Sequence, residues 1–242
     1  MQDAQIDAQG IISSLTRKTT VKHLVIASNQ HLLRIDDETT NPLSPQDETM
    51  FIKHTLKHLE NTLPDAIIFE DYDKGNITQA VIDEVVKFAN NRQIPTLVDP
   101  KKRNFNFYKG VTLFKPNFKE MTEGLRTDAI AKGDTKKIIK AANILRNKLN
   151  VKFVMVTLSE YGIVITDGDE YFSMPAQLRE IADVSGAGDT VISVAAIAMS
   201  CGFSMEQVAT IANIAGGLVC EKAGVAPVDK EQLLKEIILH YK

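Results

Sequence analysis

The chain has 242 residues, 44% of them hydrophobic and 24% charged, a composition typical of one globular α/β domain with a sizeable core. The formal net charge of −3 at pH 7 gives no electrostatic reason to expect nucleic acid or an anionic membrane as a partner. The N-terminus lacks the basic and apolar parts of a signal peptide, and the apolar run at 191–203 is shorter than the ~20 residues of a membrane span. We expect Cys201 and Cys220 to be buried free thiols, which fits a reducing cytoplasm.

Secondary-structure signals alternate along the chain between strand and helix. Before residue 62 the pattern predicts the end of a helix at 11–15, extended segments at 21–27 and 32–36, and an amphipathic helix over 46–61. Further strands are expected at 65–70, 94–99, 111–114 and 152–157, followed by a hairpin of 162–166 with 170–174. Further helices are expected at 78–91, 134–150, 190–201, 204–222 and after 229, with Thr78 and Asp134 as N-caps. This alternation predicts a mostly parallel sheet with helices on both faces.

Polar residues follow four successive predicted strands, at 70–75, 99–101, 115–120 and 157–162. Ligands of parallel α/β sheets bind beyond the carboxyl ends of the strands. A solvated loop would explain any one of these clusters by itself. Four clusters at one edge of a sheet favour a binding site.

The segment Asp-Val-Ser-Gly-Ala-Gly-Asp at 183–189 precedes an apolar helical run. Small residues ahead of a helix let backbone amides converge on an anion, which the helix dipole also favours. Asp189 falls in the first helical turn, beside such an anion. A carboxylate there can accept a proton from a hydroxyl that attacks a phosphate. The alternative interpretation is an ordinary glycine-rich turn into a core helix.

Residues 183–189 match a signature of the PfkB, or ribokinase-like, family of carbohydrate kinases, which the chain resembles over nearly its whole length. Within this family, the segments 28–36, 71–75, 98–101 and 112–117 resemble kinases that phosphorylate heptose 7-phosphate at its anomeric hydroxyl. That reaction feeds ADP-heptose synthesis for lipopolysaccharide. The resemblance implies a three-layer α/β/α ribokinase-like fold, a single kinase domain over 1–242, and ATP with Mg²⁺ as cofactors.

The resemblance also implies roles for individual residues. Asp189 would be the general base, with Gly186, Ala187 and Gly188 forming an anion hole for the transferred phosphoryl group. The implied ATP-binding residues are Asn117, Glu120, Thr157, Ser159, Gly162, Gly186, Gly188, Asn213 and Gly217, and Glu120 would also reach Mg²⁺ through water. The implied residues for the sugar phosphate are Asp71, Lys74, Asp99, Lys101 and Arg34.

Several of these residues have structural alternatives. Asn117 and Glu120 have the spacing of a capping box. Gly216 and Gly217 could serve close helix packing, and the lysines could be surface charges. His54 and His58 have the i, i+4 spacing of a zinc pair, but neighbouring lysines favour a solvated helix face.

The chain departs from the family pattern at its N-terminus. The opening strand, acidic sugar-binding residue, lid and Gly-Gly motif of the family are absent, and residues 3–10 resemble a mid-domain stretch. The resemblance therefore predicts a domain truncated at its N-terminus, with a nearly complete nucleotide half and an incomplete acceptor half. A kinase for another sugar, or an inactive nucleotide-binding remnant, is the alternative. The exposed sheet edge expected from truncation is compatible with a homodimer.

Overall fold

The computed structural model describes residues 6–15, 17–27, 30–127, 130–177 and 179–241. Of the segments that carry the resemblance, residues 28 and 29 and the first part of 3–10 lie outside these ranges. Among the described residues, no helix combines the length and the hydropathy that crossing a bilayer requires.

A six-stranded sheet in the order β3-β4-β5-β6-β7-β8 forms the centre of the molecule. β3 to β6 run parallel, whereas β7 and β8 are antiparallel, so the predicted mostly parallel sheet is confirmed. The hairpin predicted at 162–174 is the pair β7–β8. The strands are β3 Ile67–Glu70, β4 Thr96–Asp99, β5 Leu113–Phe114, β6 Phe153–Thr157, β7 Ile163–Thr166 and β8 Tyr171–Met174.

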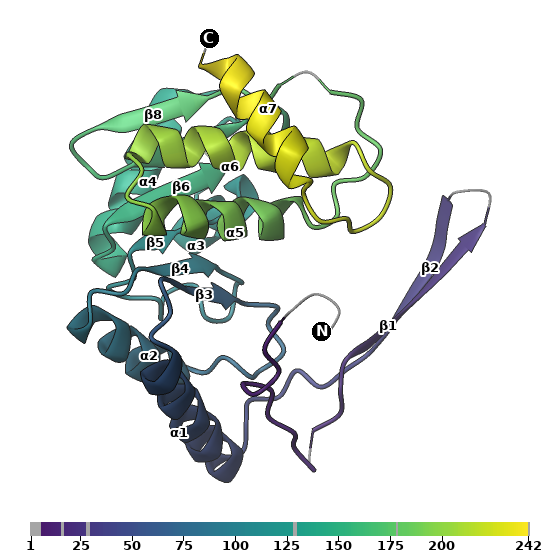
Figure 1. Ribbon diagram of the computed structural model, residues 1–242, viewed down its shortest axis with the longest axis vertical. Helices are drawn as coiled ribbons and strands as arrows, with labels where there is room; N and C mark the ends of the chain where they lie inside the picture. The colour runs from purple at the N-terminus through teal and green to yellow at the C-terminus, as the bar shows by residue number, and fades with distance from the viewer. Residues whose placement is uncertain (1–5, 16, 28–29, 128–129, 178, 242) are drawn as a thin grey trace.

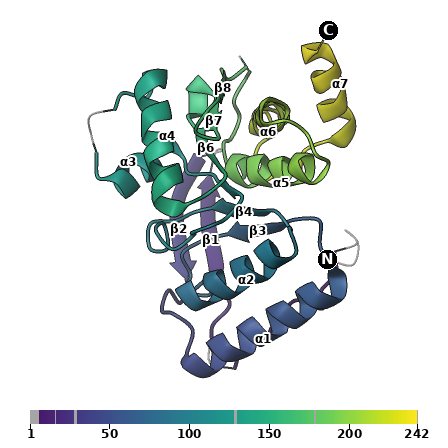
Figure 2. The same ribbon diagram turned by 90° about the vertical axis from the view of Figure 1, so that its left-hand side faces the viewer.

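Helices cover both faces of this sheet, as Figures 1 and 2 show. α1 to α4 pack on one face and α5 and α6 on the other, with α7 against α6. The arrangement confirms the three-layer α/β/α fold. The helices are α1 Pro45–Thr62, α2 Gln79–Asn91, α3 Phe118–Leu125, α4 Thr135–Leu149, α5 Ala187–Ser200, α6 Met205–Cys220 and α7 Lys230–His240.

Each face of the sheet has its own hydrophobic core, and side chains alternate between the two along every strand. Phe69, Val98 and Phe114 belong to the core under α1–α4. Leu97 and Leu113 belong to the core under α5 and α6. This alternation fixes which polar residues at the strand ends face α5.

The helix starts follow the predicted capping residues. The Thr78 hydroxyl accepts a hydrogen bond from the Val81 amide at 3.3 Å, and the Asp134 carboxylate accepts one from the Lys137 amide at 3.1 Å. Asp229 caps α7 in the same way. These caps satisfy amides that have no partner within the helix, which is why the starts are readable from sequence.

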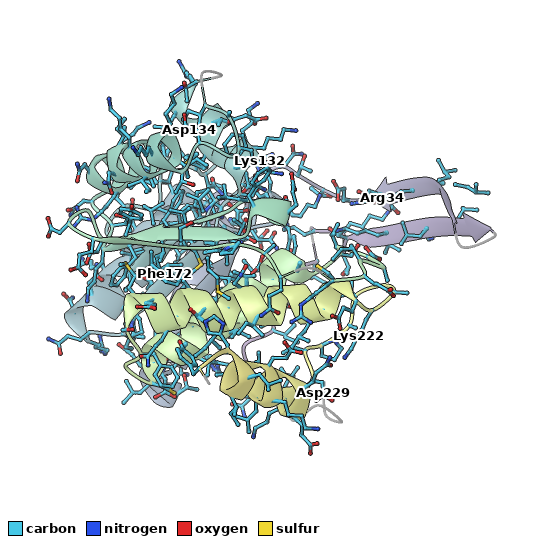
Figure 3. All side chains as sticks on the ribbon, turned by 90° about the horizontal axis from the view of Figure 1, so that it is seen from above. Arg34, Lys132, Asp134, Phe172, Lys222 and Asp229 are labelled. Carbon is cyan, nitrogen blue, oxygen red and sulfur yellow. The ribbon has the colours of Figure 1, made fainter. Side chains whose placement is uncertain are left out.

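The strands β1 Val21–Ala27 and β2 Gln30–Asp37 pair as an antiparallel hairpin that projects from the body. We call this hairpin the arm; Figures 1 and 3 show that it extends beyond the helices. Its side chains include exposed leucines at 24, 32 and 33. The extended conformation expected at 21–27 and 32–36 is therefore confirmed, whereas their pairing as an arm was not predicted.

Two sequence predictions are wrong. Residues 11–15 form no helix, and Ile11 is 58% exposed, so the apolar side chains there have no surface to bury. Short helices depend on such packing for their stability. Cys201 is exposed because it follows the last turn of α5, whereas Cys220 is buried as expected.

Candidate active site

The turn before α5 is held by Asp183. Its Oδ1 atom accepts hydrogen bonds from the backbone amide and the hydroxyl of Ser185, at 2.9 and 2.8 Å. Its Oδ2 atom accepts one from the Gly224 amide at 3.1 Å. Gly186 then adopts φ = 79° as the N-cap, a left-handed conformation that favours glycine. Asp183 and Gly186 together set the direction in which α5 begins.

The first turn of α5 carries Gly188 and Asp189. No side-chain hydrogen bond caps this end of the helix, so its free amides and dipole are available to an anion. The Ala187 amide is already engaged, because it donates to the Val184 carbonyl at 3.3 Å. Of the predicted anion hole, the amides at 186 and 188 are thus better placed than that of Ala187.

Strand register brings three further charged residues to this helix end. Glu70 pairs with Asp99 across β3 and β4, and Lys115 follows β5 at the next position of the same edge. Because side chains alternate along a strand, all three lie on the face that α5 covers. Lys115 is only 2% exposed, and its Nζ atom lies 3.0 Å from Asp99 Oδ2.

Gly188 lies against this buried ion pair. A Cβ atom at position 188 would lie 3.4 Å from Asp99 Oδ2 and 3.7 Å from Lys115 Nζ. The absence of a side chain therefore keeps open the space between the helix end and the pair. An anion held by the α5 amides would also lie close to the Lys115 ammonium group.

Three carboxylates meet at the same place. Oxygen atoms of Glu70, Asp99 and Asp189 all lie within 4.8 Å of one another. Burial, and then the charges of Asp99 and Asp189, raise the pKa of Glu70 to about 7. The three groups offer hard oxygen ligands of the kind that Mg²⁺ prefers.

The side of the site next to α3 is formed by Lys101, Glu120 and Asn117. Lys101 Nζ lies 2.9 Å from Glu120 Oε1 and 3.6 Å from Asp99 Oδ1. Burial tends to lower the pKa of Lys101, but these two carboxylates outweigh it and the pKa is raised. Asn117 and Glu120 form the capping box of α3, with both hydrogen bonds at 2.9 Å. The structural alternative for this pair is confirmed, and their predicted contacts with ATP and Mg²⁺ stay predictions.

The other predicted ATP residues form a continuous rim from β6 to α6. Thr157 bridges to Asn117, and Gly162, at φ = 84°, packs against the backbone at 174–176. Asn213 donates to the Pro175 carbonyl in that same backbone segment, at 3.0 Å. Ser159 lies between them in the short helical turn after β6.

Two glycines of α6 have different surroundings. At Gly216 a Cβ atom would approach Val191 Cγ2 to 2.7 Å, so this glycine serves close packing of α5 on α6. At Gly217 the Arg179 side chain covers the helix, with Nε 2.9 Å from the Cβ position. Arg179 is held there by Glu221 and Glu236.

Asp71 points away from the carboxylate cluster. It is 2% exposed and accepts hydrogen bonds from the Tyr108 hydroxyl at 2.7 Å and the Asn104 amide at 3.0 Å. It also accepts one from the Asp73 backbone amide at 2.8 Å. Asp71 therefore anchors the loop after β3 to the core, and its predicted contact with the sugar phosphate stays a prediction.

A cavity of about 640 Å³ adjoins the loop after β3. Lys74 lines it and forms an ion pair with Glu38 at 2.5 Å. Residues 11–14 and 17–20, the start of α1 and the base of the arm complete its walls. Arg34 is separate from this group: it lies on the arm (Figure 3) and bonds Asp36 through two contacts of 2.7 Å.

Sequence reasoning assigned no role to Glu70, Tyr72 and Lys115, although all three fall in the polar clusters after the predicted strands. Tyr72 donates a hydrogen bond from its hydroxyl to Asp189 Oδ2 at 2.9 Å. The signal that could have revealed them is period-two alternation, which places 70 and 72 on the opposite face from 71.

Residues 1–232 of the sequence match the family described as pfkB family carbohydrate kinase. The chain belongs to this family. It is accordingly a carbohydrate kinase domain, a phosphotransferase whose acceptor is a sugar hydroxyl. The family assignment agrees with the site, in which a carboxylate lies beside the start of a helix that favours anions.

Curated relatives of this pfkB domain are bifunctional proteins named HldE. The HldE protein of Wolinella succinogenes is 37% identical over 226 residues, covering 93% of this chain and 46% of its own length. That of Methylobacillus flagellatus is 33% identical over 237 residues, covering 98% of this chain and 48% of its own. The chain thus spans about half the length of these relatives.

Solved structures share the fold. Phosphofructokinase-2 from Escherichia coli, in complex with potassium, gives a TM-score of 0.77 at 16% identity over 93% of this chain and 72% of its own. A ribokinase from Arabidopsis thaliana, complexed with ribose and ATP, gives 0.68 at 20% identity over 92% of this chain and 70% of its own. At these identities the likeness establishes the ribokinase-like fold alone.

Proposed function

We propose that this domain transfers the γ-phosphoryl group of ATP to the anomeric hydroxyl of heptose 7-phosphate, as a step toward ADP-heptose and lipopolysaccharide. The single observation that carries the proposal is Asp189 in the first turn of α5, beside the side-chain-free Gly188. The acceptor assignment is supported by the motifs after β3, β4 and β5 and by the similarity to HldE proteins. The free cysteines suit the cytoplasmic location predicted from sequence.

The reaction forms one bond and breaks another. The acceptor oxygen attacks the γ-phosphorus, its proton passes to the Asp189 carboxylate, and the bond between the γ-phosphorus and the bridging oxygen breaks to release ADP. Helix amides at the start of α5 and the Lys115 ammonium group stabilise charge on the phosphoryl oxygens. The proton leaves Asp189 for solvent when the products depart.

The carboxylate cluster fits Mg²⁺. Glu70 and Asp99 would hold the ion at the edge of the site, and Glu120 remains the ligand predicted to act through water. When bound, Mg²⁺ supplies positive charge that neutralises the phosphates of ATP. Lys115 and Lys101 lie beside Asp99 and offset part of its negative charge.

The acceptor would occupy the cavity next to Tyr72. Lys22 and Lys74 line this cavity and can pair with the phosphate dianion of the sugar.

The test compares acceptors. ADP formation from ATP–Mg²⁺ is measured with heptose 7-phosphate, fructose 6-phosphate and ribose, and thermal shifts with ATP–Mg²⁺ or sugar alone report the two halves of the site separately. We expect ATP to stabilise the protein, the sugars alone to do little, and heptose 7-phosphate to give the fastest turnover. Faster turnover with another sugar would reject the acceptor, and no turnover together with no ATP shift would reject the kinase proposal.

A further inference from the structure

The hydrogen bond from Tyr72 to Asp189 joins two segments 117 positions apart in the sequence. Among the residues that the structure describes, the Tyr72 hydroxyl is the one hydrogen-bond donor to the Asp189 side chain. Nothing in the family assignment gives Tyr72 a role, and its ring is not part of either hydrophobic core. Tyr72 is half exposed, and its hydroxyl donates a hydrogen bond to the proposed base. This contact therefore needs a functional explanation.

The Tyr72 ring is held from two sides. On the core side, Asp71 is anchored by Tyr108 and Asn104, so the backbone at 72 cannot shift without breaking buried hydrogen bonds. On the arm side, the Lys22 ammonium lies 5.6 Å from the ring centroid, within reach of a cation–π contact. Tyr72 also lines the cavity proposed for the acceptor. The hydroxyl therefore reaches Asp189 from a fixed position, between the proposed sites of ATP and of the acceptor sugar.

The Tyr72 hydroxyl is the donor in this contact, and Asp189 Oδ2 accepts the hydrogen bond at 2.9 Å. A hydrogen bond to a carboxylate is directional and stronger than one between two neutral groups. The contact can therefore fix how the Asp189 carboxylate is oriented.

We propose that Tyr72 is a positioning residue for the base: its hydroxyl holds Oδ2 of Asp189, which leaves the other carboxylate oxygen to take the proton of the acceptor hydroxyl. The inference rests on the proposed function, because it assigns the orientation of the same base. Without the Tyr72 hydroxyl, no hydrogen bond among the described residues fixes the Asp189 carboxylate, and fewer molecules hold it in the productive orientation.

Replacing Tyr72 with phenylalanine keeps the ring and removes the donor. We expect kcat for Tyr72→Phe to fall about tenfold to fiftyfold, the scale of a lost hydrogen bond to a charged group. The KM for ATP should stay unchanged, because the nucleotide rim is untouched.

Tyr171→Phe is the matched control, since Tyr171 is exposed on β8 and away from the site. It should leave kcat and the KM for ATP unchanged. If Tyr72→Phe turns over at the wild-type rate, Tyr72 does not position the base. A rise in the KM for ATP with unchanged kcat would likewise overturn the inference.

A measurement without turnover separates this inference from the proposed function. The protein is labelled with 3-fluorotyrosine at its five tyrosines, and the Tyr72 signal is the one missing from Tyr72→Phe. We expect Asp189→Asn to shift that ¹⁹F signal and to leave the Tyr171 signal in place. An unmoved Tyr72 signal would show that the contact does not form in solution. If the wild type phosphorylates no sugar, the proposed function fails while the ¹⁹F result still decides whether Tyr72 holds Asp189.

Discussion

The strand-end site and the arm hold their charged residues in opposite ways. In the site, Lys115 and Asp99 come from different strands and are almost completely buried, with side-chain exposures of 2% and 8%. On the arm, Arg34 and Asp36 are two positions apart on one strand and remain accessible to solvent. The first pair exists only when the sheet has assembled, whereas the second needs nothing beyond its own strand.

This difference separates two kinds of functional residue. Groups whose position depends on strand register are coupled to the stability of the fold, so a change at one of them affects chemistry and folding together. Groups on the arm are supported locally, and a change there should affect binding alone.

The largest effect is expected at Asp189, the proposed general base. Asp189→Asn should lower kcat by roughly 10²–10⁴, the usual contribution of a positioned general base. ATP affinity, measured by calorimetry, should remain near the wild-type value because the helix amides are unchanged. An equal loss of ATP binding and turnover would show that Asp189 binds the nucleotide and is not the base.

The buried pair should give the largest effect on folding. Lys115→Met leaves the buried Asp99 with Lys101 alone, 3.6 Å away. We expect the free energy of unfolding in urea to fall by about 3 kcal/mol, the low end for breaking a buried ion pair, because Lys101 remains. Lys119→Met is the matched control, since the exposed Lys119 lies 3.8 Å from Glu123 and should matter little. Equal stability of both variants would show that burial gives the Lys115–Asp99 pair no special weight in folding.

Local signals explain most of what the sequence could predict. Thr78, Asp134 and Asp229 lie next to the amides that they cap, so the helix starts are readable without knowing the fold. The position of Asp189 in a first helical turn follows equally from its neighbours at 183–188. The segment 11–15 has an apolar pattern but no partner surface, and no local signal could have shown that absence.

The remaining features of the site depend on contacts between distant segments. The pairing of Lys115 with Asp99 requires the order and register of β4 and β5, which the sequence does not specify. The meeting of Tyr72 with Asp189 requires α5 to begin over the end of β3. Predicting that the 70–75 cluster contacts a ligand was possible, and alternation separates 70 and 72 from 71, but deciding which of these two sets faces the site required the sheet.

A smaller effect should come from Glu70, whose pKa is raised to about 7 by burial and by the charges of Asp99 and Asp189. The folded protein therefore holds this proton more tightly than the unfolded chain, in which the group titrates near 4.5. The resulting stabilisation is fully present below that value and is lost as the pH rises through about 7. Because Glu70 is only half-buried, solvent screening reduces the effect to about 1 kcal/mol.

Glu70→Gln removes this titration. As the pH rises from 5 to 8, the wild type should therefore lose free energy of unfolding relative to Glu70→Gln, as measured by urea unfolding at each pH. Glu84→Gln, an exposed position on α2, serves as the control and should follow the wild-type pH dependence. If the wild type and Glu70→Gln show the same pH dependence, Glu70 does not belong to a charged cluster in solution.

The smallest effect is expected on the arm. Arg34→Ala removes two hydrogen bonds, but both go to Asp36 on the same exposed strand, and neither ties the arm to the body. We therefore expect an unchanged Tm, measured by calorimetry, and an unchanged KM for ATP. Asp36→Asn removes the charged partner of Arg34 and keeps the guanidinium group. If Arg34 binds the phosphate of the sugar, as the family resemblance implies, the KM for the sugar phosphate should rise in Arg34→Ala and not in Asp36→Asn. A Tm lowered by several degrees in Arg34→Ala would show that the arm is part of the folded core, and the contrast with the buried pair would no longer hold.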